Sequence, residues 1–318
     1  MKRLILLAVA ALLCVGSYAQ QDSLRWAVVS TSACYLRLQP DYESPLETQS
    51  LMGTVVEVLD ADRYWRKVST PDPYVAWTND LTLSYMTEEQ KDAYIAAPKW
   101  ICTAAYEHVL RGPSLGSGRI CDLVMGDLLL QTGEATMGGW TRVRLPSGET
   151  GWVNSASLAD FATWASTRRL TAANVCSTAM QFLGVPYFWG GISPKGFDCS
   201  GLVKFCYMLN GVLLKRNASQ QVKCGEEVPI DFDLMQPGDL VFFGTPAKGS
   251  TPCKVSHVAL YIGDGRIIHS SQLVRINSLR EGEPDSYGRE PVAVRRLIGH
   301  EGEDGVTPIC MHPSYFQQ

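Results

Sequence analysis

An internal repeat in the first half of the sequence restricts the folds that this chain can adopt. Several short elements occur twice, in the same order and at nearly the same separation. Self-similarity of this kind indicates two copies of one structural unit. The matched elements are Met52-Gly53 with Met125-Gly126, the W-x-x-V of Trp65 and Val68 with that of Trp140 and Val143, and the W-x-N of Trp77 and Asn79 with that of Trp152 and Asn154.

Each copy reads as a series of short strands. The segments VVEVL and DLLLQ are rich in strand-forming residues, and the later segments STPD and LPSG are typical turn sequences. Short strands separated by such turns favour a small barrel. We therefore predict one barrel over residues 24–86 and another over residues 99–162, joined by a short linker helix over residues 87–98.

The N-terminus has the layout of a secretory signal peptide. Two basic residues precede an apolar run over residues 4–15, and the small-residue pattern Ser17-Tyr18-Ala19 follows. The run is too short for a comfortable membrane span, and no second run of spanning length occurs. The Ala-Leu-Leu before Cys14 argues against a lipid-attachment site. We expect residues 1–20 to be a signal peptide and the mature protein to be periplasmic or extracellular.

Export changes how the ten cysteines are interpreted, because disulfides form outside the cytosol. Without Cys14 their number is odd, so at least one thiol stays free or pairs with another molecule. The absence of a C-x-x-C pair argues against a zinc ribbon. We expect most of these cysteines to be small buried residues, and one disulfide remains open. The net charge of −4 gives no indication of nucleic acid or a membrane surface as a partner.

The segment GFDCSGLV, residues 196–203, places Cys199 where a glycine-rich loop turns into a helix. The first N–H groups of a helix lack intrahelical partners, and the helix dipole is positive there. A thiolate at this position is stabilised, which predicts a lowered thiol pKa, and the same N–H groups could hold an oxyanion. This setting favours a nucleophilic cysteine over a structural one.

Two histidines later in the chain are candidates for the base that such a cysteine needs. The segment HVALYIG reads as a strand, Gly263-Asp264-Gly265 as a tight hairpin turn, and RIIHSS as the partner strand. His257 begins the first strand and His269 falls near the end of the second. Because these positions are nearly symmetric about the turn, we expect the two imidazoles to lie side by side, one as base and one as its orienting group.

From about residue 168 the chain resembles the NlpC/P60 superfamily of papain-like cysteine peptidases. The matching segments are LGVPYFWGG, GFDCSGLV, LMQPGDLVFFG and HVALYIGDGRIIHS, in that order. The two N-terminal units resemble bacterial SH3-type (SH3b) domains. The resemblance implies an α+β fold, with a helical layer on an antiparallel sheet over residues 168–300, preceded by two small all-β barrels and followed by a tail, residues 301–318. The implied roles are Cys199 as nucleophile, His257 as base, His269 as its orienting residue and Tyr187 beside the oxyanion.

Two SH3-type domains before the peptidase are similar to the YkfC-like branch of γ-D-glutamyl-L-diamino acid dipeptidyl-peptidases. These enzymes cut between γ-D-glutamate and meso-diaminopimelate or L-lysine in peptidoglycan stem peptides with a free N-terminal L-Ala. The resemblance implies no metal or cofactor, and we expect a monomer. The substrate-contacting residues it suggests are Asp198, Ser200, Tyr74 of the first barrel, Ser219, Gln220 or Gln221, and Glu57 as the acidic residue of that barrel.

Three rival interpretations remain open. The first is an amidase or acyltransferase on the same fold, which would keep the Cys–His pair and change the cleft. The second is a non-catalytic wall-binding protein, which predicts a lost nucleophile or base, whereas both are present in this sequence. The third is an endopeptidase acting on intact cross-linked wall, which should tolerate a blocked L-Ala amine.

Overall fold

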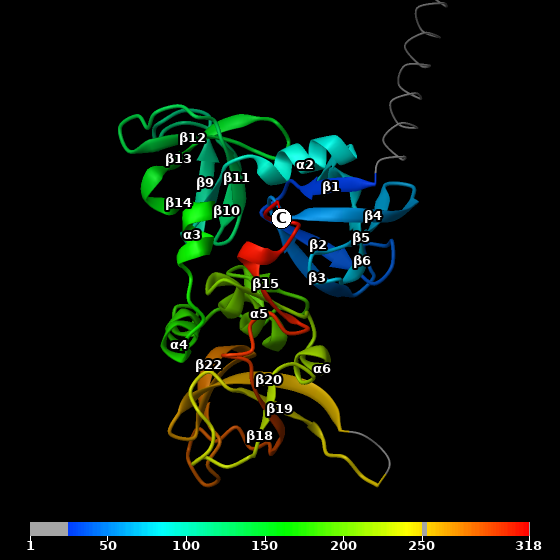
Figure 1. The fold of residues 1–318 in the computed structure, drawn as a ribbon, viewed down its shortest axis with the longest axis vertical. Coiled ribbons are helices and arrows are strands. Elements are labelled where there is room, and N and C mark those ends of the chain that lie inside the picture. Colours follow the sequence, from blue (N-terminus) through cyan, green and yellow to red (C-terminus); the bar gives the residue numbers. More distant parts are fainter. Residues whose placement is uncertain (1–24, 250–252, 318) are drawn as a thin grey trace, which may run out of the picture.

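The computed structural model describes residues 25–249 and 253–317. The predicted signal peptide, residues 1–20, lies outside the described residues. Two all-β units lie above a larger unit that contains helices and a sheet (Figure 1). In the described part of the chain, no helix is long and apolar enough to cross a membrane.

The first all-β unit is a single antiparallel sheet with the strand order β3-β2-β6-β5-β4-β1-β7. Only one residue pair joins β2 to β6, Arg37 with Trp77, which is where the sheet bends over its core. The core consists of alternate, inward-facing residues of the strands, among them Val29, Leu36 and Val56. The elements are β1 (Trp26–Val29), β2 (Ala33–Arg37), β3 (Leu46–Leu51), β4 (Val55–Asp62), β5 (Trp65–Ser69), β6 (Val75–Asn79), η1 (Asp80–Thr82) and β7 (Leu83–Met86).

The second unit repeats this topology strand for strand, with the order β10-β9-β13-β12-β11-β8-β14. The single-pair connection between two strands occurs here as well, since only Leu110 and Trp152 join β9 to β13. The repeated sequence elements therefore fold into equivalent strands. The elements are β8 (Lys99–Cys102), β9 (Tyr106–Leu110), β10 (Arg119–Val124), β11 (Leu128–Gln131), β12 (Trp140–Arg144), β13 (Thr150–Asn154), η2 (Ser155–Ser157) and β14 (Leu158–Asp160).

The repeated Met-Gly pairs lie at the contact between the two units. Gly53 and Gly126 both have a positive φ, which a glycine adopts without steric cost. A side chain at Gly53 would also meet the Cβ of Leu128 at 2.5 Å. The Met52 N–H donates to the buried Asp127 carboxylate at 3.0 Å, and the Leu128 N–H donates to the Met52 carbonyl. Glycine is needed here because the two backbones approach so closely.

A helix connects the two units, within the segment for which the sequence predicts one. This helix, α2 (Glu88–Ala96), begins with a capping box in which the Thr87 and Gln90 side chains each bond the other's backbone N–H. Tyr94 and Ile95 pack against the first unit.

The third unit has an antiparallel sheet of order β18-β23-β19-β20-β21-β22, and α4 and α5 pack against it. This arrangement confirms the predicted α+β fold class. Its elements are α3 (Phe161–Thr167), α4 (Ala172–Met180), β15 (Ile192–Ser193), β16 (Gly196–Phe197), α5 (Cys199–Leu209), β17 (Val212–Leu214), α6 (Ala218–Gln221), β18 (Glu226–Val228), β19 (Leu240–Thr245), β20 (Lys254–Gly263), β21 (Arg266–Ser271), β22 (Leu273–Ser278), β23 (Pro291–Arg296), β24 (Val306–Pro308) and η3 (Ile309–Met311).

The C-terminal segment returns from this unit toward the two barrels (Figure 1). Its strand β24 pairs with β17, and Tyr315 and Phe316 then pack their rings against Phe161. His312 contacts the Pro71 carbonyl of the first barrel at 3.1 Å. Ile309 also shares a core cluster with Ile101 and Leu128 of the second barrel, so the tail that the sequence predicts over residues 301–318 contacts all three units.

All nine cysteines in the described part of the chain are free thiols. Most of them are buried or half-buried, and Cys310 is exposed. The disulfide that the sequence left open is therefore not formed between described residues.

Candidate active site

Cys199 is the first residue of α5, at the helix position that the sequence predicts. The helix begins there because the Asp198 carboxylate accepts a hydrogen bond from the Gly201 N–H at 2.7 Å and so caps it. The Cys199 side chain is 9% exposed, and it faces a cleft between the first barrel and the third unit. This cleft is lined by Glu47, Tyr187, Trp189, Asp198, Cys199, Ser200, Asn217, Ala218, Ser219, Val255, Ser256 and His257.

The two histidines of the β20–β21 hairpin lie side by side beneath this cleft. Asp264 and Gly265 both have positive φ, as a two-residue type I′ turn requires, so the hairpin turns at the residues predicted from the sequence. The Nε2 of His257 lies 2.7 Å from the Nδ1 of His269. Both rings are buried, and His257 reaches the cleft wall.

A residue that sequence reasoning missed, Asn277 of β22, completes this series of hydrogen bonds. Its Oδ1 lies 2.9 Å from the Nε2 of His269, and its Nδ2 donates to the Asp285 carbonyl at 2.7 Å. Because a carbonyl can only accept, the Asn277 NH₂ must face Asp285 and its oxygen must face His269. The orientation of this amide is therefore determined by the backbone.

The orientation of Asn277 settles which nitrogens carry protons. His269 Nε2 must donate to Asn277 Oδ1, so in the neutral ring His269 Nδ1 is an acceptor. That nitrogen then receives the N–H of His257 Nε2. The remaining nitrogen of His257, Nδ1, is left with a free lone pair. His257 is thus prepared to take a proton from a group in the cleft.

Burial favours the neutral form of Cys199, His257 and His269. It lowers the pKa of His257 to about 3 and that of His269 to about 4. Burial, followed by the negative charge of Asp198, raises the pKa of the Cys199 thiol to about 11. The lowered thiol pKa predicted from the helix N-terminus is therefore wrong for this structure, because desolvation outweighs the helix dipole.

Aromatic rings enclose the histidine pair. Tyr287, from the loop after β22, places its ring edge-on to His269 at a centroid distance of 4.5 Å and lies 5.5 Å from His257. Phe243 of β19 contacts His257 at 5.8 Å and Tyr287 at 5.0 Å. These contacts exclude water from the pair, which is the physical cause of its lowered pKa values.

Tyr187 lies in the loop before Cys199, on the cleft wall, where the sequence places it. Its backbone N–H donates to the Gln272 carbonyl at 2.8 Å, which ties the loop to the sheet. Burial, then the neighbouring Cys199, raises the pKa of its hydroxyl. Tyr187 is consequently a neutral hydrogen-bond donor beside the sulfur.

Asp198 is held by a buried arginine that sequence reasoning did not assign. Arg216, which is 1% exposed, binds both carboxylate oxygens of Asp198 and donates to Ser200 Oγ at 2.9 Å. Its Nε donates to Thr48 of the first barrel at 2.7 Å. Gly190 N–H and the helix cap occupy further lone pairs of the same carboxylate. Arg216 is the first residue of the RNASQQ segment, and this arginine was the one feature of the sequence that could have pointed to a partner for Asp198.

The acidic residue that the first barrel contributes to the cleft is Glu47, and the prediction of Glu57 is wrong. Glu47 of β3 accepts a hydrogen bond from the Tyr74 hydroxyl. Burial and this contact raise the pKa of Tyr74 to about 12. Glu57 lies on β4 beside β1, where its carboxylate pairs with Arg25 at 2.6 Å. Glu57 therefore lies beside the N-terminal strand of the barrel and does not line the cleft.

The predicted polar residues of α6 separate into two groups. Ser219 lines the cleft, together with Ser200 of α5. Gln220 does not, because its side-chain oxygen accepts from the Asn217 N–H at the start of α6. Gln221 is fully buried and donates to the Ser200 and Lys215 carbonyls. Both glutamines therefore support the local backbone, and Asn217 and Ala218 line the cleft instead.

A cysteine at a helix N-terminus and an oriented histidine pair on a facing sheet together define a papain-like cysteine peptidase site. Comparison with known proteins agrees with this class. The NlpC/P60 family matches residues 184–289, and the bacterial dipeptidyl-peptidase Sh3 domain matches residues 36–80. That second family matches the first barrel only, so the identity of the other barrel as an SH3-type domain rests on its strand order and stays a prediction.

Two curated relatives align along most of the chain. Dipeptidyl-peptidase 6 of Lysinibacillus sphaericus is 32% identical over 270 residues, which cover 81% of this chain and 93% of the relative. The γ-D-glutamyl-L-lysine dipeptidyl-peptidase of Bacillus cereus is 30% identical over 265 residues, covering 80% and 75%. The crystal structure of an NlpC/P60 family protein from Bacillus cereus superposes with a TM-score of 0.71 at 26% identity, covering 86% of this chain and 99% of that one. This chain belongs to the NlpC/P60 family of cysteine peptidases.

Proposed function

We propose that this protein hydrolyses the γ-D-glutamyl-L-diamino acid bond of peptidoglycan stem peptides that begin with a free L-Ala. The observation that carries the proposal is Glu47 of the first barrel, which lines the same cleft as Cys199 and accepts a hydrogen bond from the Tyr74 hydroxyl behind it. A carboxylate beside a neutral phenol is suited to bind an ammonium group. The relatives named dipeptidyl-peptidase support this specificity, because removal of a dipeptide requires recognition of a free amine two residues from the cut.

The catalytic steps follow from the tautomers of the histidine pair. His257 Nδ1 takes the proton of the Cys199 thiol as the sulfur attacks the γ-glutamyl carbonyl. This transfer avoids a free thiolate, which the buried site disfavours. The imidazolium formed on His257 shares its Nε2–H with His269, which in turn is held by Asn277. The charge is thus stabilised by the oriented neighbours while it exists.

The tetrahedral intermediate carries an oxyanion that needs donors. The Cys199 N–H lies in the first turn of α5, where no intrahelical carbonyl is available, and the Tyr187 hydroxyl is neutral and close to the sulfur. His257 then protonates the leaving amine of the diamino acid, and the acyl group remains on sulfur as a thioester. Water, deprotonated by the same imidazole, hydrolyses the thioester and restores the thiol.

The buried Asp198–Arg216 pair organises the residues around the nucleophile. Arg216 connects Asp198, Ser200 and Thr48, and so links the start of α5 to the first barrel. Asp198, Ser200 and Ser219 line the cleft and remain proposed contacts of the substrate.

We propose the domain organisation that the sequence predicts. It comprises a signal peptide over residues 1–20, barrels over residues 24–86 and 99–162, the peptidase over residues 168–300, and the tail that follows it. We place the enzyme outside the cytosol, as a monomer, in the turnover or recycling of cell-wall peptides. The N-terminal sequence supports this location, and relatives that include a murein endopeptidase support the substrate.

The test compares L-Ala-γ-D-Glu-diamino acid with its N-acetylated form, with digests analysed by mass spectrometry. The expected products are L-Ala-D-Glu and the free diamino acid, from the free-amine peptide only. Equal cleavage of both forms would sink the free-amine specificity and favour the endopeptidase alternative. Cleavage by Cys199→Ala would exclude the mechanism, and release of an acyl-transfer product instead of the two fragments would indicate the amidase or acyltransferase alternative.

A further inference from the structure

The chemistry of the cleft determines where the leaving diamino acid must lie. His257 protonates the leaving nitrogen, so this nitrogen has to come within hydrogen-bond reach of the His257 ring. The leaving residue therefore extends over the beginning of β20, where Val255 and Ser256 form the cleft wall. Glu47, the proposed contact of the substrate amine, belongs to the first barrel and serves the other part of the peptide.

A cation lies at the part of the cleft that faces the leaving residue. The Arg289 guanidinium donates to Ser256 Oγ at 3.2 Å and to the Tyr287 hydroxyl at 3.4 Å, and it lies over the Tyr287 ring at 5.8 Å. Its positive charge also acts on His257, whose pKa it lowers after burial and His269. These contacts place the guanidinium next to the base and next to a residue of the cleft wall.

Arg289 differs in its partners from the arginines of the peptidase unit that form ion pairs. Arg216, Arg266, Arg295 and Arg296 each form an ion pair with a carboxylate. Among the described residues, no carboxylate lies within ion-pair distance of Arg289, and its side chain is exposed. Arg275 also lacks a carboxylate, but its contact is with Gln272, which does not line the cleft.

We propose that Arg289 binds a carboxylate of the leaving diamino acid, an inference that rests on the function proposed above. A guanidinium binds a carboxylate through two parallel hydrogen bonds, whereas it repels an ammonium group because both are cations. Two carboxylates are possible on this residue, the α-carboxylate of a chain-terminal diamino acid and the side-chain carboxylate of meso-diaminopimelate. L-Lysine carries an ammonium group in place of the second one. Arg289 therefore selects for a leaving residue with negative charge.

Four peptides separate the two sources of the carboxylate. They share L-Ala-γ-D-Glu and end in meso-diaminopimelate or L-lysine, each with a free or an amidated α-carboxyl. The lysine amide has no carboxylate on the leaving residue. We expect kcat/KM of the native enzyme to be lowest for this peptide, with the difference arising in KM.

The decisive variant is Arg289→Gln, with Arg289→Lys as the conservative replacement. Arg280→Gln is the matched control, because Arg280 is an exposed arginine that pairs with no carboxylate among the residues the structure describes. It lies over Phe232 and beside Gly265, at the far end of the β20–β21 hairpin. We expect Arg289→Gln to lower kcat/KM roughly fivefold for peptides with the recognised carboxylate, given the strength of an exposed charge-assisted pair. The lysine amide should be unaffected, Arg289→Lys should retain part of the preference, and Arg280→Gln should match the native enzyme.

The pattern of losses decides among the outcomes. A loss restricted to the meso-diaminopimelate peptides assigns the side-chain carboxylate, and a loss restricted to peptides with a free α-carboxyl assigns that group. An equal loss on all four peptides would overturn the inference and point to the glutamyl carboxylate, and so would no loss on any of them. In both of these cases the proposed function stands. If the native enzyme cuts none of the four peptides, the proposed function and this inference fall together.

Discussion

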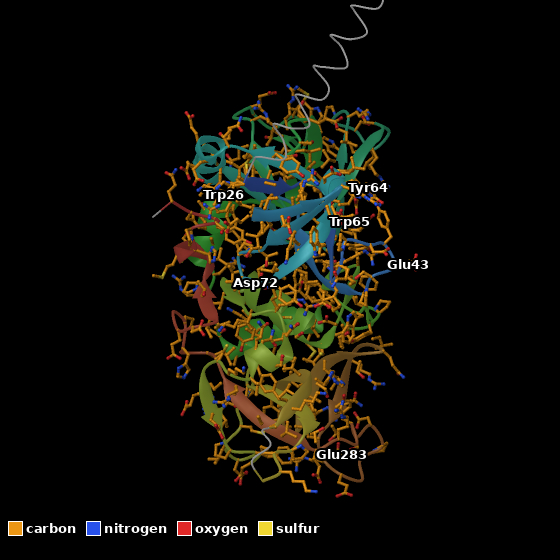
Figure 2. All side chains as sticks on the ribbon, turned by 90° about the vertical axis from the view of Figure 1, so that its right-hand side faces the viewer. Trp26, Glu43, Tyr64, Trp65, Asp72 and Glu283 are labelled. Atoms are coloured by element: carbon orange, nitrogen blue, oxygen red, sulfur yellow. The ribbon has the colours of Figure 1, made fainter. Side chains whose placement is uncertain are left out.

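The ammonium group of Lys204 lies 2.9 Å from the carboxylate of Asp72, although the two residues belong to different units of the protein. Lys204 is on α5, the helix that begins with Cys199, and Asp72 is in the turn between β5 and β6 of the first barrel. Figure 2 shows Asp72 at the boundary between the barrel and the peptidase unit. Tyr74 follows two residues after Asp72. Its hydroxyl donates to Glu47, so we infer that this buried ion pair holds the proposed amine-binding residue in position relative to Cys199.

Breaking this pair should affect both stability and amine recognition. Asp72→Asn removes the negative charge opposite Lys204 and leaves only the neutral Leu214 carbonyl and an amide oxygen to accept its hydrogen bonds, and loss of the charge of one member of a buried pair costs about 3 kcal/mol. We expect a lower midpoint in urea unfolding and a raised KM for the free-amine peptide. Asp304→Asn, which removes an ion pair with Lys215 at a carboxylate that is 90% exposed, is the control and should change little. Native KM in Asp72→Asn would contradict the positioning role.

Glu47 should account for the preference for a free amine. Glu47→Gln removes the charge that we propose binds the ammonium group, and a hydrogen bond to a charged group contributes roughly 1.5–3 kcal/mol, or about a tenfold or larger loss of kcat/KM. Cleavage of the N-acetylated peptide should stay at its low level. Glu57→Gln makes the same chemical change in the same barrel but outside the cleft, paired with Arg25. If the two variants behave alike, Glu47 does not read the amine.

Asn277 should act on catalysis through the histidine pair. Asn277→Leu removes the acceptor for His269 Nε2–H, so the pair loses its preferred tautomer, and kcat should fall about 10- to 100-fold, which is within the range of a general-base contribution. Asn277→Asp places a negative charge there, which favours the imidazolium form and raises the pKa of both rings. The acidic limb of its kcat–pH profile should therefore shift to higher pH than in the native enzyme. An unshifted limb in Asn277→Asp, together with native kcat in Asn277→Leu, would show that the tautomer argument fails.

Alkylation should report the neutral state of the nucleophile. With the pKa of the Cys199 thiol raised to about 11 by burial and by Asp198, roughly one molecule in ten thousand carries a thiolate at pH 7. Because the thiolate is the reactive form, iodoacetamide should label Cys199 slowly at neutral pH, and the rate should rise about tenfold per pH unit up to the alkaline range. Peptide mass spectrometry separates this label from those on the other thiols, with Cys199→Ala as the blank. Fast, pH-independent labelling at neutral pH would indicate a thiolate–imidazolium pair instead.

The elements that carry the catalytic residues could be predicted because each depends on neighbouring residues. Gly263-Asp264-Gly265 forms a tight turn by its own backbone preferences, and this turn brings the two strands together. A register shift between Tyr261 and Gly263 also helps to set which positions of the strands face each other, and the sequence did not predict it. The expected proximity of His257 and His269 followed from counting away from this turn. The start of α5 at Cys199 likewise required only the capping residue before it.

The residues that were missed or misassigned depend on contacts between distant parts of the chain. Glu47 and Glu57 are both acidic residues on strands of the first barrel, and only the packing of that barrel against the peptidase decides which one reaches the cleft. Arg216 contacts Thr48 across 168 residues of sequence. Asn277 is identified only by the His269 nitrogen that it faces.

The sequence by itself determined the repeated barrels, the helix that begins at Cys199 and the hairpin that carries His257 and His269, because turns, caps and strand alternation act over a few residues. Only the tertiary structure decided the electrostatic state of the site. Burial, which no local pattern reports, reverses the effect of the helix N-terminus on the thiol and keeps both imidazoles neutral. Tertiary packing also decided that Glu47 lines the cleft and that Arg289 contacts Ser256 of the cleft wall, because these positions depend on how separate segments of the chain pack against one another.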